Sequence, residues 1–337
     1  MRKGVGLPVR ILGGLCLLAL AAGCSYAQND DEMMAKRRIF KDAGPGLKAV
    51  RRGANGNTYV LASPTPGLAV YDASGKVIFS IGVGPAGASG AASNSMVYGE
   101  DCDVAGDGKI YIADRGANAI EIFSAEGVLL RRIAVNAPIS VAALPEGEIA
   151  VATLRQPHLV IVYDKNGRLV REFGDPEPIA EREELNRYLS IGQLATDALG
   201  HLYYAFTFTP EPTVRQYDRV GYAGQDFQYL AVDALPAALA VRREIARQER
   251  RGDAPSLKRN LTAVGVESAT GEVWVALHNT LLHFDKDGNR RASYQLYTPE
   301  GARLEASTIL VEKDRLIIGS DPLGIYEFER PDKKPRE

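Results

Sequence analysis

Short apolar runs recur along the chain between polar turns, and most of these turns contain a glycine. Five times, a turn glycine is followed 17 to 21 residues later by a second one, with strand-like stretches between them. The pairs are Gly56/Gly75, Gly108/Gly127, Gly147/Gly167, Gly200/Gly221 and Gly271/Gly288, and a sixth copy near Asp314 lacks the glycines. Repeats of roughly 40 to 50 residues with short strands are typical of propeller blades. The pattern therefore predicts an all-β, six-bladed β-propeller.

Each copy can be divided into four short strands. In the clearest copy the strands are expected at 101–105, 109–113, 119–124 and 128–133, with turn residues between them. The third strand of every copy ends in an aromatic residue, namely Tyr71, Phe123, Tyr163, Tyr217, Phe284 and Phe328. An aromatic side chain at a fixed position fills the wedge between neighbouring blades, so we expect a packing role for this set.

The clearest copy also resembles the NHL repeat, in which a turn glycine, an apolar strand ending in aspartate, an asparagine and a second apolar strand follow one another. Gly108, Asp114 and Asn118 carry this pattern, with apolar runs at 110–113 and 120–123. The basic residue expected after the asparagine is Ala119, and the other copies depart from the pattern at the aspartate. The resemblance implies an NHL-like six-bladed propeller over most of residues 40–330, without implying a shared activity.

The last copy provides only three strands, at 307–311, 316–319 and 324–329, before a polar tail over 331–337. The segment from Arg37 to Lys41 precedes the first blade and has no other partner. We therefore expect it to supply the fourth strand of the sixth blade, because this pairing removes two free sheet edges and closes the ring.

The connections between copies vary in length, from 20 residues between Gly127 and Gly147 to 50 between Gly221 and Gly271. All the long connections and the turns between second and third strands are expected on one face, and long loops on a rigid scaffold commonly carry binding sites. Helices are expected within 177–189 and 233–252, the second capped by Asp233 and Gly252. The basic stripe of helix 235–251 could contact anionic lipid or an acidic partner, or could be a solvated face with local ion pairs.

The turns beside these insertions supply the candidate contact residues for a ligand. On position alone we name Asp114, Arg115, Asn118, Arg155, His158 and His278. The glycine-rich insertion 83–95 is either a flexible lid or a loose loop.

The N-terminus has the pattern of an export signal, with Arg2, Lys3 and Arg10 before an apolar stretch at 11–22. The sequence LAAGC that ends at Cys24 resembles the lipobox of bacterial lipoproteins, which implies lipidation of Cys24 and anchoring in the cell envelope. Cleavage after Ala27 is the alternative and would release a soluble periplasmic or secreted protein. We predict a signal peptide at 1–23, a lipidated tether at 24–36, the propeller at 37–330 and a polar tail at 331–337.

Charge and cysteine content narrow the classes of partner. Removal of residues 1–23 takes away three of the 40 basic residues and leaves 37 against 42 acidic ones, a net charge of −5. A mildly acidic protein is not expected to bind nucleic acid. With Cys24 lipidated, Cys102 would be the only remaining cysteine and could not form an intramolecular disulfide.

The first strands of the blades are expected to line a central channel. This channel offers few groups for catalysis. Two families on related scaffolds are comparable: propeller lactonases, which hold a divalent metal with carboxylates and asparagine, and the amidating lyase, which holds zinc with histidines. Here Asp101 and Asp103, with Glu100, form one acidic patch among neutral residues, which is too few ligands for a metal cage. His158 and His278 are also too few for a three-histidine zinc site, unless a carboxylate such as Asp114 or Asp321 completed one.

We therefore expect no catalytic residue, metal or cofactor. The sequence favours an exported propeller, lipid-anchored in the envelope, that binds a protein, peptide or glycan at its insertion-rich face. The alternatives are a metal-dependent lactonase- or lyase-like enzyme in the central channel and a structural subunit of an envelope complex.

Overall fold

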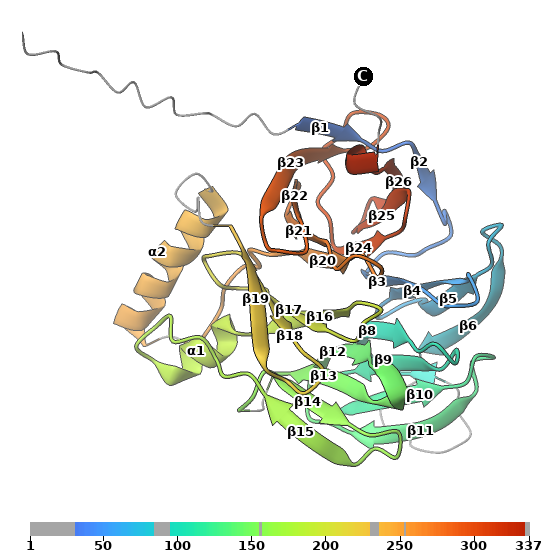
Figure 1. The fold of residues 1–337 in the computed structure, drawn as a ribbon, viewed down its shortest axis with the longest axis horizontal. Coiled ribbons are helices and arrows are strands. Elements are labelled where there is room, and N and C mark those ends of the chain that lie inside the picture. The colour runs from blue at the N-terminus through green and yellow to red at the C-terminus, as the bar shows by residue number, and fades with distance from the viewer. Residues whose placement is uncertain (1–30, 84–94, 155–156, 230–235, 253, 334–337) are drawn as a thin grey trace, which may run out of the picture.

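In the computed structural model, residues 31–83, 95–154, 157–229, 236–252 and 254–333 are described. They form six β-sheets arranged around a central axis, and each sheet contains a four-stranded antiparallel blade (Figure 1). The predicted six-bladed β-propeller is therefore confirmed. The signal peptide, Cys24, Arg155, Asp233 and most of the glycine-rich insertion lie outside the described residues.

The first three blades follow chain order from the axis outward. Blade 1 contains β3 (Leu47–Arg52), β4 (Thr58–Ala62), β5 (Gly67–Tyr71) and β6 (Val77–Val83), to which the short β7 (Ser95–Met96) adds in parallel. Blade 2 contains β8 (Gly99–Val104), β9 (Ile110–Asp114), β10 (Ala119–Phe123) and β11 (Leu129–Ala134). Blade 3 contains β12 (Pro138–Ala143), β13 (Ile149–Thr153), β14 (Val160–Tyr163) and β15 (Leu169–Phe173).

The remaining blades differ in how they end. Blade 4 contains β16 (Gly192–Thr196), β17 (Leu202–Phe206), β18 (Thr213–Tyr217) and β19 (Ala223–Gln228). Blade 5 contains β20 (Ala263–Val266), β21 (Val273–Leu277), β22 (Thr280–Phe284), β23 (Arg290–Tyr297) and, outermost, β1 (Asp31–Met34). Blade 6 contains β24 (Thr308–Val311), β25 (Arg315–Ser320), β26 (Gly324–Glu329) and β2 (Arg37–Ile39).

The N-terminal strand closes the ring as predicted. β2 pairs antiparallel with β26, with Arg37 opposite Glu327 and Ile39 opposite Ile325. The strand ends at Ile39, and the ring of Phe40 then packs 4.6 Å from the ring of Tyr71 in blade 1, measured between centroids. The first and last blades are thus joined by a strand and by an aromatic contact.

Part of the segment predicted as a tether, residues 24–36, belongs to the sheet structure, because β1 covers Asp31–Met34. Its four residues pair in parallel with β23, and Met33 is 6% exposed within the core of blades 5 and 6. β23 is an outer strand, so its free backbone groups can accept one more strand. A single buried Met33 in a short polar segment gives too little periodicity to predict that pairing from the sequence.

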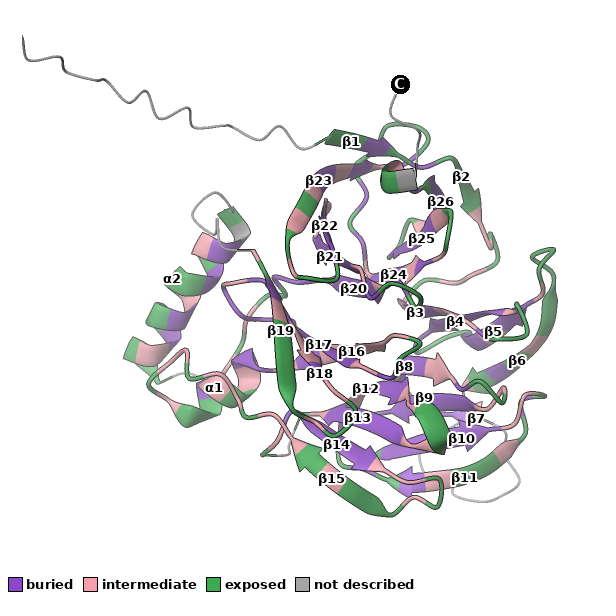
Figure 2. Ribbon diagram, in the orientation of Figure 1, coloured by how far each residue is buried: buried purple, intermediate pink, exposed green. Residues whose placement is uncertain are grey.

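The core lies between the blades and not within one central cluster. Inner and middle strands are buried, whereas the outer strands β15 and β19 are largely exposed (Figure 2). Five of the six third-strand aromatics are buried in these interfaces, and Tyr163 is half-buried. The turn glycines adopt the left-handed conformation that their spacing implied; Gly108 and Gly127 have φ of 85° and 82°.

Both α-helices of the described residues belong to long connections and lie together beside blade 4 (Figure 1). α1 (Glu183–Leu189) and α2 (Pro236–Arg251) share one apolar cluster with the turn after β17, formed by Leu185, Leu189, Phe208, Val241 and Ile245. Gly252 ends α2 with a φ of 67°, and its N–H donates to the carbonyl of Gln248 at 2.9 Å. No helix in the described part of the chain has the length and apolar character needed to cross a membrane.

Candidate functional site

A cavity of about 260 Å³ opens at the end of the central channel that faces the insertions. The first strands of blades 1, 2, 3 and 4 and the residue that precedes the first strand of blade 6 line it, together with residues of both helical insertions. We call it the channel-mouth cavity; the residues used below are Lys48, Glu100, Arg115, Leu154, Tyr188, Ile191, Phe208 and Arg259. The cavity lies on the axis because the innermost strand of every blade lies next to the axis.

The charges in this cavity are unbalanced. Glu100 accepts a contact from the Nζ of Lys48 at 2.8 Å and from the Nε of Arg115 at 2.8 Å. Both cations also lie over the ring of Tyr98, 5.1 and 5.2 Å from its centroid. Arg259 is exposed and has no ion pair with any described residue. The cavity is therefore lined by three cations and one carboxylate, which favours an anionic group in it.

The walls of the channel-mouth cavity are apolar and aromatic. Tyr188 from the α1 insertion and Phe208 from the turn after β17 pack with their ring centroids 4.9 Å apart. Leu154 and Ile191 complete this side. A concave apolar wall next to a few converging charges is typical of ligand sites.

Asp101 and Asp103, the acidic residues predicted to face the channel, lie on β8, the innermost strand of blade 2. Both carboxylates accept hydrogen bonds from neighbouring blades. Asp101 is 6% exposed; it accepts hydrogen bonds from the guanidinium of Arg51 at 2.8 Å, the hydroxyl of Ser140 at 2.5 Å and the backbone N–H of Val141 at 3.3 Å. Asp103 accepts from the backbone N–H of Ala143 at 2.8 Å. Burial raises the pKa of both carboxyls, and the Arg51 guanidinium opposes only part of that rise.

These contacts identify the acids as connectors between blades. The inner strand of a blade has an edge toward the channel, and its N–H groups need acceptors. Two hydroxyls do the same between other blades: that of Ser140 accepts from the N–H of Leu194 at 2.9 Å, and that of Thr308 accepts from the N–H of Val50 at 3.1 Å. We conclude that Asp101 and Asp103 hold neighbouring blades together and are not free to bind a metal.

Asp114, one of the predicted contact residues, is engaged by backbone groups of its own turn and of the connection that leads into blade 2. It is fully buried, and its carboxylate accepts hydrogen bonds from the backbone N–H groups of Val97 at 2.6 Å, Tyr98 at 2.9 Å and Ala117 at 2.9 Å. It thereby fixes the incoming connection of blade 2 against its own turn. A carboxylate that already has three backbone donors and no exposed surface cannot receive a ligand.

The other predicted contact residues within the described part of the chain do not converge on one site. The amide oxygen of Asn118 accepts from the N–H of Ala137 at 3.0 Å, which ties the turn to the next connection. The Nδ1 of His158 lies 3.5 Å from Asp175, and that of His278 lies 3.7 Å from Glu305. Neither histidine lines the channel-mouth cavity. Of the five predicted contact residues that the structure describes, only Arg115 does.

Several lining residues were not predicted from the sequence, among them Tyr188, Phe208 and Arg259. A signal for two of them was available, because a long insertion that leads into a first strand must end over the axis where that strand begins. Tyr188 stands four residues before β16, and Arg259 four residues before β20. The last residues of an insertion are therefore better candidates than the regular turns.

One group of side chains in the described residues has the spacing of metal ligands, but its chemistry is that of an ion-pair cluster. One potential ligand atom from each of Glu272, His283 and Asp332 lies within 4.8 Å of the others. Arg330, which is fully buried, lies 2.9 Å from Glu272, 2.6 Å from Asp332 and 2.9 Å from Glu267. An arginine keeps its charge in proteins, so it already neutralises the oxygens that a cation would need. We call this group the Arg330 cluster.

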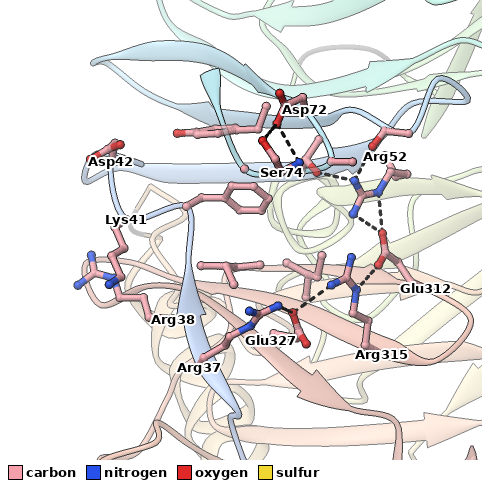
Figure 3. Close-up of a pocket in the computed structure, with 18 residues that line it drawn as sticks. Arg37, Arg38, Lys41, Asp42, Arg52, Asp72, Ser74, Glu312, Arg315 and Glu327 are labelled. Atoms are coloured by element: carbon pink, nitrogen blue, oxygen red, sulfur yellow. Dashed lines mark hydrogen bonds and ion pairs between the residues drawn. The ribbon is translucent and has the colours of Figure 1, made fainter. Parts of the chain in front are cut away.

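Two further cavities accompany the ring. A groove of about 560 Å³ follows the seam between blades 6 and 1, where Arg37, Glu327, Arg315, Glu312 and Arg52 form a continuous series of ion pairs (Figure 3). These pairs link the two blades that closure brings together. The opposite end of the channel holds a cavity of about 670 Å³ with mainly apolar inner-strand walls, and no histidine is among its described lining residues.

Comparison with known proteins supports the fold. No protein-family model and no curated protein sequence matches the chain. A streptogramin B lyase structure is 12% identical over 86% of this chain and 84% of that one, with a TM-score of 0.54. Hydrazine synthase from Kuenenia stuttgartiensis is 11% identical over 85% and 96%, with a TM-score of 0.53. A presumed exported protein from Bacteroides fragilis NCTC 9343 is 11% identical over 89% and 94%, with a TM-score of 0.58.

At these identities the similarity shows the fold alone. The chain is a six-bladed β-propeller protein, and its function has to be argued from its own side chains.

Proposed function

We propose that the protein is an exported, lipid-anchored propeller that binds an envelope protein, peptide or glycan through an anionic group at the channel-mouth cavity. The observation that carries this proposal is the excess of cations: Lys48, Arg115 and Arg259 line the cavity, whose only described carboxylate, Glu100, pairs with the first two. Two insertions and the regular ring converge on the same cavity, so a ligand there would contact both.

The enzymatic alternative needs imidazole or several carboxylates at the axis. Among the described lining residues of the channel-mouth cavity, Glu100 is the only carboxylate and histidine is absent. Both oxygens of Glu100 are already engaged, one by Lys48 and the other by Arg115. No specific observation therefore favours a lactonase- or lyase-like activity over binding.

Substitution of Arg115 by alanine is expected to weaken ligand binding about tenfold without changing stability. Loss of one charge-assisted hydrogen bond to an anion accounts for a change of that size. The fold should tolerate the change, because Glu100 keeps its contact with Lys48 and Arg115 is 43% exposed. The mature domain would be screened against arrays of acidic, neutral and basic peptides and oligosaccharides, and the Kd of the best binder measured for each variant.

The control for this experiment is Arg131→Ala, which removes an exposed arginine from the outer strand of blade 2 and should leave the Kd unchanged. If no array member binds, or if Arg115→Ala and Arg131→Ala bind equally well, binding at the channel mouth is wrong. A passive structural subunit would then be the better interpretation.

The lipid anchor is tested separately. The lipobox-like sequence before Cys24 predicts that the mature chain incorporates labelled palmitate and sediments with membranes. Cys24→Ala should abolish the label, whereas Cys16→Ala should retain it because Cys16 lies in the predicted signal peptide. A mature N-terminus after Ala27, with no lipid, would instead show the soluble alternative.

A further inference from the structure

A fourth cavity, of about 510 Å³, lies between α2 and the returning segment 256–259. We call it the α2 groove; Val241, Glu244 and Arg247 of α2 form one wall, and Leu257, Lys258 and Arg259 form the other. His278, from the turn between β21 and β22, lines it as well. The groove therefore joins the basic insertion to the insertion-rich face of blade 5.

The walls of the α2 groove are held in place by hydrogen bonds. Gln248 is 1% exposed, and its amide donates to the carbonyl of Ser256 at 2.7 Å and accepts from the Ser256 N–H at 3.1 Å. At the other end, the buried side chain of Asn260 donates to the carbonyls of Thr209 at 2.9 Å and Pro210 at 3.0 Å. Such a groove exists before a ligand arrives, which lowers the entropic cost of binding.

The groove carries excess positive charge. Glu244 is paired with Arg247 one turn away, and hydrogen bonds from Arg247 and Gln248 lower the pKa of Glu244 to about 2. Lys258 and Arg259 are both exposed and have no ion pair with any described residue. The paired Glu244 and Arg247 balance one another, so Lys258 and Arg259 leave the groove cationic. Anions are the complementary ligands.

Arg259 lines both the α2 groove and the channel-mouth cavity. Cationic side chains therefore line both cavities: Lys258 and Arg259, which have no ion pair with a described residue, and then Arg115 and Lys48, which pair with Glu100. Val241 and Leu257 add apolar surface beside this path. A ligand that matches it is extended and bears carboxylates with apolar groups between them.

We propose that the α2 groove binds an acidic peptide segment of a partner protein, with alternating carboxylate and apolar side chains, that extends toward the channel mouth. This inference rests on the proposed function and names its ligand class. A peptide fits the apolar wall better than a hydroxyl-rich glycan does, because unpaired hydroxyls against apolar surface are costly. A flat lipid surface would instead meet the outward arginines of α2, among them Arg243, Arg250 and Arg251.

The probe is a labelled six-residue peptide of four glutamates and two leucines, with the mature full chain at low ionic strength. Lys258→Glu, at a residue that lines only the α2 groove, is expected to raise the Kd about tenfold, as reversal of one contacting charge should. Arg250→Glu/Arg251→Glu reverses two charges on the same helix outside the groove and should change the Kd less than about threefold. A peptide with glutamine in place of glutamate should not bind.

The inference is overturned if the Arg250→Glu/Arg251→Glu variant weakens binding as much as Lys258→Glu does. The peptide would then be attracted only by the overall positive charge of this region and not by the groove. The inference is also overturned if vesicles with anionic lipid bind the chain and compete with the peptide through Arg250 and Arg251. If Lys258→Glu has no effect while Arg115→Ala still lowers ligand affinity, the groove is wrong and the channel-mouth function stands. If neither Lys258→Glu nor Arg115→Ala changes the Kd, both the α2-groove inference and the channel-mouth function are wrong.

Discussion

Replacement of Arg330 by methionine is expected to lower the free energy of unfolding by about 3 to 5 kcal/mol, the usual cost of breaking a buried ion pair by removing one partner. Arg330 is fully buried and contacts Glu267, Glu272 and Asp332. Methionine fills part of its volume but leaves three carboxylates without their common cation. Urea unfolding at neutral pH measures the change, and the midpoint should fall without a change in the slope.

The same substitution should change how stability depends on pH. Burial alone would raise the pKa of Glu267 and Asp332, but hydrogen bonds and the charge of Arg330 outweigh it and lower both. A carboxyl whose pKa is lower in the folded state stabilises the protein at every pH above its pKa in the unfolded state, which is near 4. This stabilisation is lost as the pH falls through the pKa of the folded state. The difference in free energy of unfolding between wild type and Arg330→Met should thus be largest at neutral pH and become smaller as the pH is lowered.

Arg291 provides the matched control for Arg330. Its side chain is 62% exposed and pairs with Asp285 at 2.5 Å, so Arg291→Met should cost no more than about 1 kcal/mol. An equal loss in the two variants, or a loss from Arg330→Met that does not depend on pH, would show that the cluster acts through packing and not through charge.

Substitution of Asp114 by alanine is expected to lower the free energy of unfolding by about 2 to 4 kcal/mol, because three backbone N–H groups lose their acceptor. Asp114→Asn keeps one acceptor oxygen and should lie between alanine and wild type. Thermal unfolding and the Kd of the array-selected ligand are measured together. Arg115→Ala, at the next residue, should show the reverse pattern, with weaker binding and unchanged stability.

An Asp114→Ala protein that melts like the wild type but binds the ligand more weakly would contradict this structural role. It would restore Asp114 as a contact residue. The comparison therefore separates the part of the NHL-like pattern that builds the blade from the part that faces a ligand.

Most of the fold could be predicted because turn chemistry repeats. A glycine such as Gly108 is needed where the backbone adopts positive φ, so it marks the same turn in successive blades. Closure by Arg37–Ile39 followed from the missing strand of the last blade. β1 could not be found in this way, because its place is set by the free edge of β23 and not by a pattern of its own.

The site was harder to predict because it depends on which polar groups the fold itself uses. Asp101 and Asp114 stood at suitable positions, yet backbone N–H groups of neighbouring segments take their oxygens. The need of inner-strand edges for acceptors could have indicated this for Asp101. Arg259 and Tyr188 belong to insertions, and their approach to the axis follows from the tertiary path of the chain.

The two N-terminal strands also determine how the ring would respond to mechanical load. A pull on the chain before Asp31 reaches β1 first, and β1 is the fifth strand of blade 5 (Figure 1). Detachment of β1 from β23 leaves six complete four-stranded blades, including the β2–β26 pair that closes the ring. β1 would thus yield before the closure does, so tension applied at the N-terminal end would act first at the rim of blade 5 while the channel mouth keeps its shape.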